Sequence, residues 1–136
     1  MTGRGSRRRR LWLPAVAVVS WLALSGTGLP AASAAGTCSP NGNALTIQAF
    51  DGKFDKDCLA APANQALTID FNNLDRGIPH NVAIYKTDSD DNAMFKGELI
   101  EGPKRTTYNV PGLPAGNWVF RCDPHPDMHG TFIVAS

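Results

Sequence analysis

Three side chains with affinity for soft metal ions lie close together near the end of the 136-residue chain. Cys122, His125 and Met128 supply a thiol, an imidazole and a thioether at intervals of three residues. Thiolate and thioether ligands select copper, and copper sites that transfer electrons use two His and one Cys with a long axial Met. The spacing therefore predicts most of a copper site, with one histidine still to be supplied.

The whole chain contains three histidines, so the missing ligand must be one of the two besides His125. His80 stands just before a strand-like run at Asn81–Lys86, well upstream of Cys122. His129 is the competing candidate, but two imidazoles from one short loop would strain it, so we expect His129 to point away. We therefore predict His80 as a ligand, although a strand-edge residue without a metal role is the alternative interpretation.

The loop motif resembles that of a known family. The spacing Cys-x-x-His-x-x-Met from Cys122 to Met128, with Pro124 and Pro126 in place, is similar to that of amicyanins. Upstream, the segment Pro79–Val82 resembles the first ligand segment of small blue copper proteins. The resemblance is to the plastocyanin and amicyanin branch of the cupredoxins.

This resemblance covers roughly Leu45–Val134 and implies both a fold and a cofactor. The implied fold is an all-β, Greek-key sandwich or barrel of about seven to eight strands. The implied cofactor is one type 1 copper per chain, held by His80, Cys122, His125 and Met128. The implied activity is transport of single electrons between redox partners.

The resemblance also suggests roles for residues around the ligands. Asn81 matches a family asparagine that ties the two ligand loops together, although a polar residue at a strand start is the alternative. Pro124 lacks an N–H that could bond the Cys122 sulfur, and such bonds tune redox potentials. His125 should present its ring edge at the surface as the route for the electron. Asp127 departs from the bulky apolar residue common there, so partner surfaces cannot be transferred from relatives.

Other chemistries fit these residues less well. Cys122 with His125 or His80 could form a nucleophile and base, but no third orienting group is evident. Three histidines are too few for a multicopper oxidase, and the loop lacks the second Cys of a binuclear copper site. A structural zinc site would not normally use a methionine. We therefore expect no enzymatic activity.

The elements that must position the ligands are predicted to be short β-strands. Their residues are rich in Ile, Val, Thr, Phe and Tyr and are separated by Asp, Asn, Gly and Pro. In one run Leu67, Ile69 and Phe71 alternate with polar residues and should face the core. Residues 51–63 and 87–93 are expected to be loops. The predicted strands are Ala44–Phe50, Ala66–Asn72, Asn81–Lys86, Phe95–Ile100, Thr106–Val110, Asn117–Cys122 and Thr131–Ala135.

The first 35 residues are typical of a secretory signal peptide, with a basic start, an apolar middle and small residues at the end. The apolar stretch Leu11–Leu24 is shorter than the about 20 residues of a comfortable membrane span. We therefore expect residues 1–35 to be removed, leaving one domain over residues 36–136 without a transmembrane segment. An uncleaved anchor is the alternative, and the run Arg7–Arg10 also allows twin-arginine export.

Charge and cysteine content agree with export. Five of the 13 basic residues and none of the 12 acidic ones lie in the predicted signal, so the remainder carries 8 against 12, net −4. Such a domain offers no basic patch for nucleic acid. Cys38 and Cys58 are the expected disulfide pair, since both lie early among loop-like residues and oxidising compartments favour the bond. Pairing of Cys122 with either one is the alternative, and it would destroy the ligand loop.

Together these patterns predict an exported, monomeric blue copper protein located outside the cell, in the periplasm or at the cell surface. Its partners would be redox proteins, which the sequence does not name. The alternative function is copper storage, delivery or detoxification with the same ligands. A copper-free interaction module would be favoured only if Cys122 were disulfide-bonded.

Overall fold

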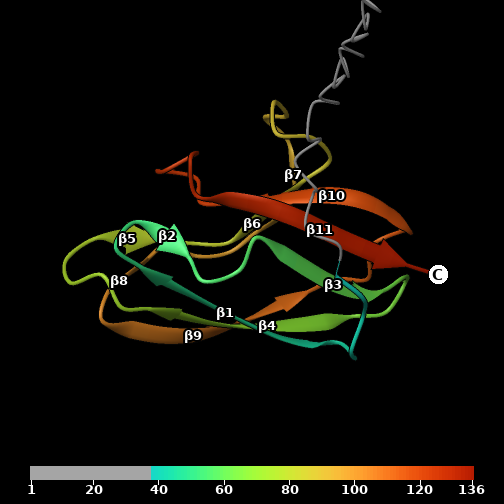
Figure 1. Cartoon of the computed structure of the whole chain (residues 1–136), viewed down its shortest axis with the longest axis horizontal. Coiled ribbons are helices and arrows are strands. Elements are labelled where there is room, and N and C mark those ends of the chain that lie inside the picture. Colours follow the sequence, from blue (N-terminus) through green and yellow to red (C-terminus); the bar gives the residue numbers. More distant parts are fainter. Residues whose placement is uncertain (1–37) are drawn as a thin grey trace, which may run out of the picture. The chain divides into compact units, whose positions relative to one another are not determined.

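A computed structural model describes residues 38–136 of the chain, and the predicted signal peptide at 1–35 lies outside them. The described residues form strands and turns without a helix, so none of them belongs to a helix that could span a membrane (Figure 1). The strands are β1 (Ala44–Phe50), β2 (Lys53–Phe54), β3 (Cys58–Pro62), β4 (Leu67–Asn73), β5 (Pro79–His80), β6 (Ala83–Tyr85), β7 (Ala93–Lys96), β8 (Ile100–Glu101), β9 (Lys104–Val110), β10 (Gly116–Arg121) and β11 (His129–Ala135).

The strands form two main sheets that lie as two layers in Figure 1. One sheet has the order β2-β1-β4-β9, and the other has the order β3-β11-β10-β6-β7. The short strands β5 and β8 form a separate pair. Both main sheets are mixed, because β1 pairs with β4 and β3 pairs with β11 in parallel. The predicted all-β sandwich is confirmed.

The core lies between the two layers and follows from the alternation of each strand. Leu67, Ile69 and Phe71 on β4 are 0–3% exposed, which confirms the predicted inward face. Phe120 on β10 and Phe132 on β11 are fully buried in the same cluster. These aromatic side chains belong to the two strands that flank the loop between β10 and β11.

Strand β3 corrects the prediction of a loop over residues 51–63. Its sequence, Cys58-Leu59-Ala60-Ala61-Pro62, has two alanines and a proline and therefore little intrinsic strand preference. It pairs in parallel with β11 over Thr131–Ala135 and buries Leu59. The strand exists because of this tertiary pairing, which local sequence patterns do not reveal.

The predicted strand over Phe95–Ile100 is in fact divided into β7 and β8 by Gly97. The Gly97 N–H donates to the Val82 carbonyl at 3.0 Å. A Cβ on Gly97 would lie 2.7 Å from the Tyr108 ring and 2.8 Å from the Val82 oxygen. The point where the two strands separate therefore has no room for a side chain.

The expected disulfide is present. Cys38 and Cys58 are bonded, with their Cα atoms 6.0 Å apart, while Cys122 is a free, buried thiol. The bond ties the segment before β1 to β3, which is the partner of β11. Among the described residues Cys122 thus remains available as a ligand.

Candidate metal centre

The loop between β10 and β11 closes on itself through two backbone hydrogen bonds. The Cys122 N–H donates to the Met128 carbonyl, and the Met128 N–H donates to the His125 carbonyl, each at 2.9 Å. Strand β10 ends at Arg121 and β11 begins at His129, so the loop is tighter than the predicted strand ends imply. These bonds bring three of the predicted ligands to one end of the sandwich.

His80 lies at the same end of the sandwich, although it precedes Cys122 by 42 residues. It lies on β5 and is paired with Ile100 on β8. The predicted continuous strand over Asn81–Lys86 is shorter in the structure, because β6 spans only Ala83–Tyr85. Asn81 and Val82 separate β5 from β6, and the His80 side chain at the end of β5 is 1% exposed.

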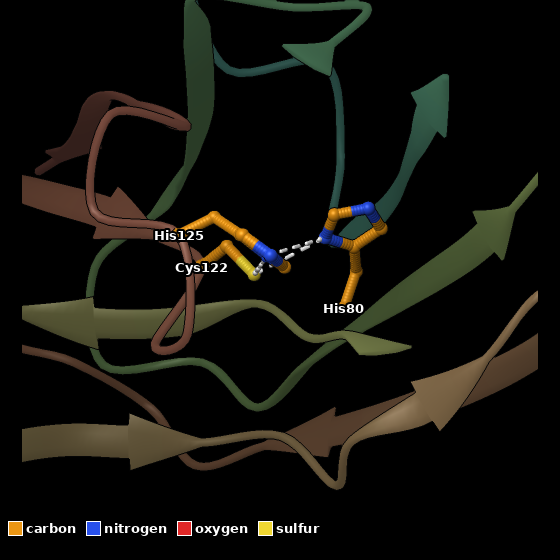
Figure 2. A group of neighbouring side chains, drawn as sticks. All are labelled: His80, Cys122 and His125. Carbon is orange, nitrogen blue, oxygen red and sulfur yellow. Dashed lines mark hydrogen bonds between the residues drawn. The ribbon is translucent and has the colours of Figure 1, made fainter. Parts of the chain in front are cut away.

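The three predicted nitrogen and sulfur ligands converge, as Figure 2 shows. Cys122 Sγ lies 3.5 Å from His80 Nδ1 and 3.7 Å from His125 Nδ1, and the two nitrogens are 3.1 Å apart. Donor atoms that bind one ion at roughly 2.0–2.3 Å stand roughly 3–4 Å from one another. The observed separations therefore suit a single first-row metal ion.

Met128, the fourth predicted ligand, is 3% exposed. It lines an open hollow of about 740 Å³ together with His80 and His125. Other parts of the wall come from the turn at Asp51–Gly52 and from Ile78. The hollow gives a second molecule access to the imidazole of His125, which is only partly buried.

Asn81 joins the two ligand-bearing segments. Its Oδ1 accepts the Asp123 N–H at 2.9 Å, and its Nδ2 donates to Asp123 Oδ2 and to the Gly97 carbonyl, both at 2.9 Å. Asn81 is fully buried and follows His80 directly, while Asp123 follows Cys122. The amide thus holds the two ligand segments in a fixed relation.

The surroundings of Cys122 change the pKa of its thiol in opposite directions. Burial raises the pKa of the Cys122 thiol, while the backbone N–H groups of Asn81 and His125 favour the thiolate. The charge of Asp123 disfavours the thiolate. A cation within reach of the sulfur would offset the cost of burying the thiolate, because metal ligation deprotonates a thiol.

Comparisons with known proteins agree with this geometry. The family model of the cupredoxin-like domain matches residues 14–134 of the chain. The chain belongs to the cupredoxin-like domain family. No curated protein sequence matches it.

Solved structures of cupredoxins share its fold. An auracyanin from Roseiflexus castenholzii superimposes with a TM-score of 0.61 at 20% identity, over 69% of this chain and 98% of that one. Auracyanin A from Chloroflexus aurantiacus, described as a "blue" copper protein, has a TM-score of 0.60 at 21% identity, over 68% and 98%. Amicyanin from Paracoccus versutus has a TM-score of 0.51 at 28% identity, over 68% and 81%.

The donor set of this cupredoxin resembles a type 1 copper site and fits copper better than zinc. It offers two imidazoles, a thiol and a buried thioether, and soft sulfur ligands favour copper. The residues that would hold the ion are His80, Cys122, His125 and Met128.

The remaining candidates lie elsewhere. His129 is exposed, and its Nδ1 is 3.3 Å from Asp88 Oδ1, outside the group of converging ligands. Met94, the other methionine among the described residues, is 47% exposed on β7 and does not line the hollow. Ile78 is 44% exposed, and Pro79, Pro124 and Pro126 are exposed as well, so these four residues form an apolar rim along part of the hollow. Charged residues, Asp51, Arg76 and Asp127, line other parts of it.

Sequence analysis missed two groups that support the ligands. Asp75 Oδ2 lies 2.9 Å from His80 Nε2. Tyr85 donates its hydroxyl to Asp123 Oδ1 at 2.5 Å, and Lys96 Nζ is 3.1 Å from Asp123 Oδ2. A carboxylate five residues before a predicted histidine ligand was the available signal for Asp75. The Asp123 contacts depend on the packing of β6 and β7 and have no local signal.

Proposed function

We propose that this cupredoxin is an exported carrier of single electrons, with one type 1 copper bound by His80, Cys122, His125 and Met128. The observation that carries the proposal is the convergence of the two Nδ1 atoms and Sγ within 3.1–3.7 Å of one another. Such an arrangement needs little rearrangement to bind an ion, so the loaded and empty sites would be similar. Electron transfer benefits when little must move.

The chain's own residues account for the remaining requirements of a carrier. A bound copper ion would supply the one-electron couple between Cu(II) and Cu(I). His80, Cys122 and Met128 are at most 3% exposed, so water reaches little of the surface of these three side chains. Pro124 and Pro126 restrict how the loop can relax. His125 offers the partly exposed edge through which a partner would exchange the electron.

A catalytic role is not part of the proposal. Cys122 is the side chain that could act as a nucleophile, but it is 0% exposed and faces two imidazole nitrogens. A substrate carbonyl could not approach a sulfur so enclosed. The apolar rim at Ile78 and Pro79 suits contact with a redox protein rather than capture of a small substrate.

Export is supported by the disulfide and by the composition of the first residues. Cys38–Cys58 is a bond that oxidising compartments favour. We propose that residues 1–35 are a removed signal peptide and that residues 36–136 act as a monomer outside the cytoplasm. Twin-arginine and general secretion both remain compatible with Arg7–Arg10.

A spectroscopic titration tests the copper assignment. Purified residues 36–136 would be titrated with Cu(II), alongside a Cys122→Ser control. We expect an intense blue thiolate-to-copper band in the parent and no such band in the control. A colourless product would overturn the assignment.

Voltammetry of the same sample tests the carrier role. We expect a reversible one-electron wave and rapid exchange with a second redox protein. A blue site without reversible exchange would favour copper storage or delivery instead.

A further inference from the structure

The carboxylate of Asp75 lies behind His80 and is held by three donors. Its Oδ1 accepts the Asp51 N–H at 2.6 Å, and its Oδ2 accepts the Gly52 N–H at 2.9 Å. The third contact joins Oδ2 to His80 Nε2 at 2.9 Å. The turn between β1 and β2, the segment after β4 and the ligand on β5 therefore meet at one side chain.

The position of Asp75 is imposed by the backbone around it. Asn73 Oδ1 accepts the Asp75 N–H at 3.0 Å, and Asn73 Nδ2 donates to the carbonyls of Ile78 and Ile100 at 2.8 and 2.7 Å. Asn73 is fully buried. The loop that carries Asp75 is thus fixed on both sides of the carboxylate, independently of the imidazole that it contacts.

The contact has a direct consequence for the imidazole. An ionised carboxylate only accepts hydrogen bonds, so His80 Nε2 must carry the proton and Nδ1 must be free in the neutral ring. His80 Nδ1 is the atom that faces Cys122 Sγ at 3.5 Å. The backbone N–H groups of Asp51 and Gly52 already donate to the Asp75 carboxylate, and such bonds favour its ionised form, so Asp75 acts as the acceptor and His80 as the donor.

We propose that Asp75 is a positioning residue that fixes the Nε2–H tautomer of His80, aims Nδ1 at the metal and places a negative charge one ring away from it. The charge part of this inference rests on the proposed copper function. A negative charge stabilises Cu(II) more than Cu(I), because the more highly charged ion gains more from the same field. Asp75 therefore lowers the reduction potential of the site.

The first arm of the test needs no metal. Nitrogen-15 NMR of the copper-free parent protein reports which ring nitrogen of His80 carries the proton. We expect the Nε2–H form to predominate in the parent, and Asp75→Asn to shift the ring toward a mixture of tautomers. The Asn side chain has one acceptor oxygen where Asp75 uses two. A parent ring that is mainly Nδ1–H would overturn the proposal, whether or not any variant folds.

The second arm compares metal affinities and potentials. We expect Asp75→Asn to weaken Cu(II) binding about 10- to 100-fold, as loss of an outer partner of a ligand histidine does. Cu(I) binding should weaken less, so the reduction potential should rise. The matched control is Asp70→Asn, which removes a carboxylate from the middle of β4, the strand before the segment that carries Asp75; Asp70 Oδ1 lies 3.5 Å from Arg105 Nε.

The outcomes separate this inference from the proposed function. Equal affinities and potentials for Asp75→Asn and Asp70→Asn would overturn the charge role of Asp75. If the parent forms no blue copper site, the proposed function fails and the charge role fails with it. The tautomer measurement would then still decide whether Asp75 positions the His80 ring.

Discussion

Asn81 and Asp123 are joined by two hydrogen bonds of 2.9 Å, one to the Asp123 backbone N–H and one to its carboxylate. The two residues are 42 positions apart, and each directly follows a proposed copper ligand. The spacing between His80 and Cys122 therefore depends on a side-chain amide rather than on regular strand pairing. Burial raises the pKa of Asp123, but hydrogen bonds from Tyr85, Asn81 and Lys96 lower it by more, so the net pKa lies below its ordinary value. The carboxylate is therefore charged at neutral pH.

Replacing Asn81 with Ala should destabilise the copper-free protein by about 2 to 6 kcal/mol. The substitution leaves the Asp123 N–H and the Gly97 carbonyl without their buried partner, and each such loss costs about 1–3 kcal/mol. Urea unfolding measures the change. The matched control is Asn109→Ala, at an exposed position of β9, which should change stability by at most about 0.5 kcal/mol. Equal effects of the two substitutions would contradict a linking role for Asn81.

Pro124→Ala should raise the reduction potential of the copper-loaded protein. The Cys122 sulfur already accepts hydrogen bonds from the backbone N–H groups of Asn81 and His125. Alanine restores an N–H at position 124, and a further donor to the sulfur withdraws charge from the thiolate and favours Cu(I). Voltammetry measures the shift. Pro126→Ala, in the same loop, is the control and should change the potential less, and an unchanged potential in Pro124→Ala would refute the idea.

The loop ligands and the sandwich were predictable from the sequence because both depend on local patterns. Cys122, His125 and Met128 are spaced within one loop, and alternation in strands such as β4 shows which face is buried. Strand β3 was missed because its alanines have little preference for strands, and the strand forms only through its pairing with β11. Asp75 was missed because its three partners, among them His80 and Gly52, come together only when the sheets pack. The residues proposed to bind the metal could be predicted from the sequence, whereas the residues that hold these proposed ligands in place depend on tertiary structure.

Replacing both Cys38 and Cys58 with Ser should lower the free energy of unfolding by about 3 kcal/mol, since the bond closes a loop of intermediate length in the unfolded chain. The blue band should be unchanged, because the bond joins β3 to the segment before β1 and supplies no ligand. Denaturation monitored by fluorescence, together with the visible spectrum, checks both statements. Loss of the band with retained stability would show that the disulfide positions the site rather than stabilising the fold.

The raised pKa of the buried Tyr108 should make the free energy of unfolding fall as the pH rises above about 10. Its side chain is 6% exposed and donates to the Glu98 carbonyl at 2.6 Å. Burial, then the charge of Glu98, then that of Cys122, raise the pKa of Tyr108 above its ordinary value of 10.0. The folded state therefore keeps the hydroxyl proton at a pH where the unfolded chain releases it. The stabilising contribution is complete below about pH 10 and declines as the pH rises above it.

The test compares the parent with Tyr108→Phe in copper-free form between pH 7 and pH 12. At pH 7 the variant should be about 1 kcal/mol less stable, because it lacks the hydrogen bond to Glu98. Above pH 10 the parent should lose up to about 1.4 kcal/mol per pH unit more than the variant, since one tyrosine no longer titrates on unfolding. The two stability curves should therefore converge above pH 10 and cross before pH 12. Parallel curves across this range would mean that Tyr108 ionises equally in the folded and unfolded chains, and that its burial does not protect the proton.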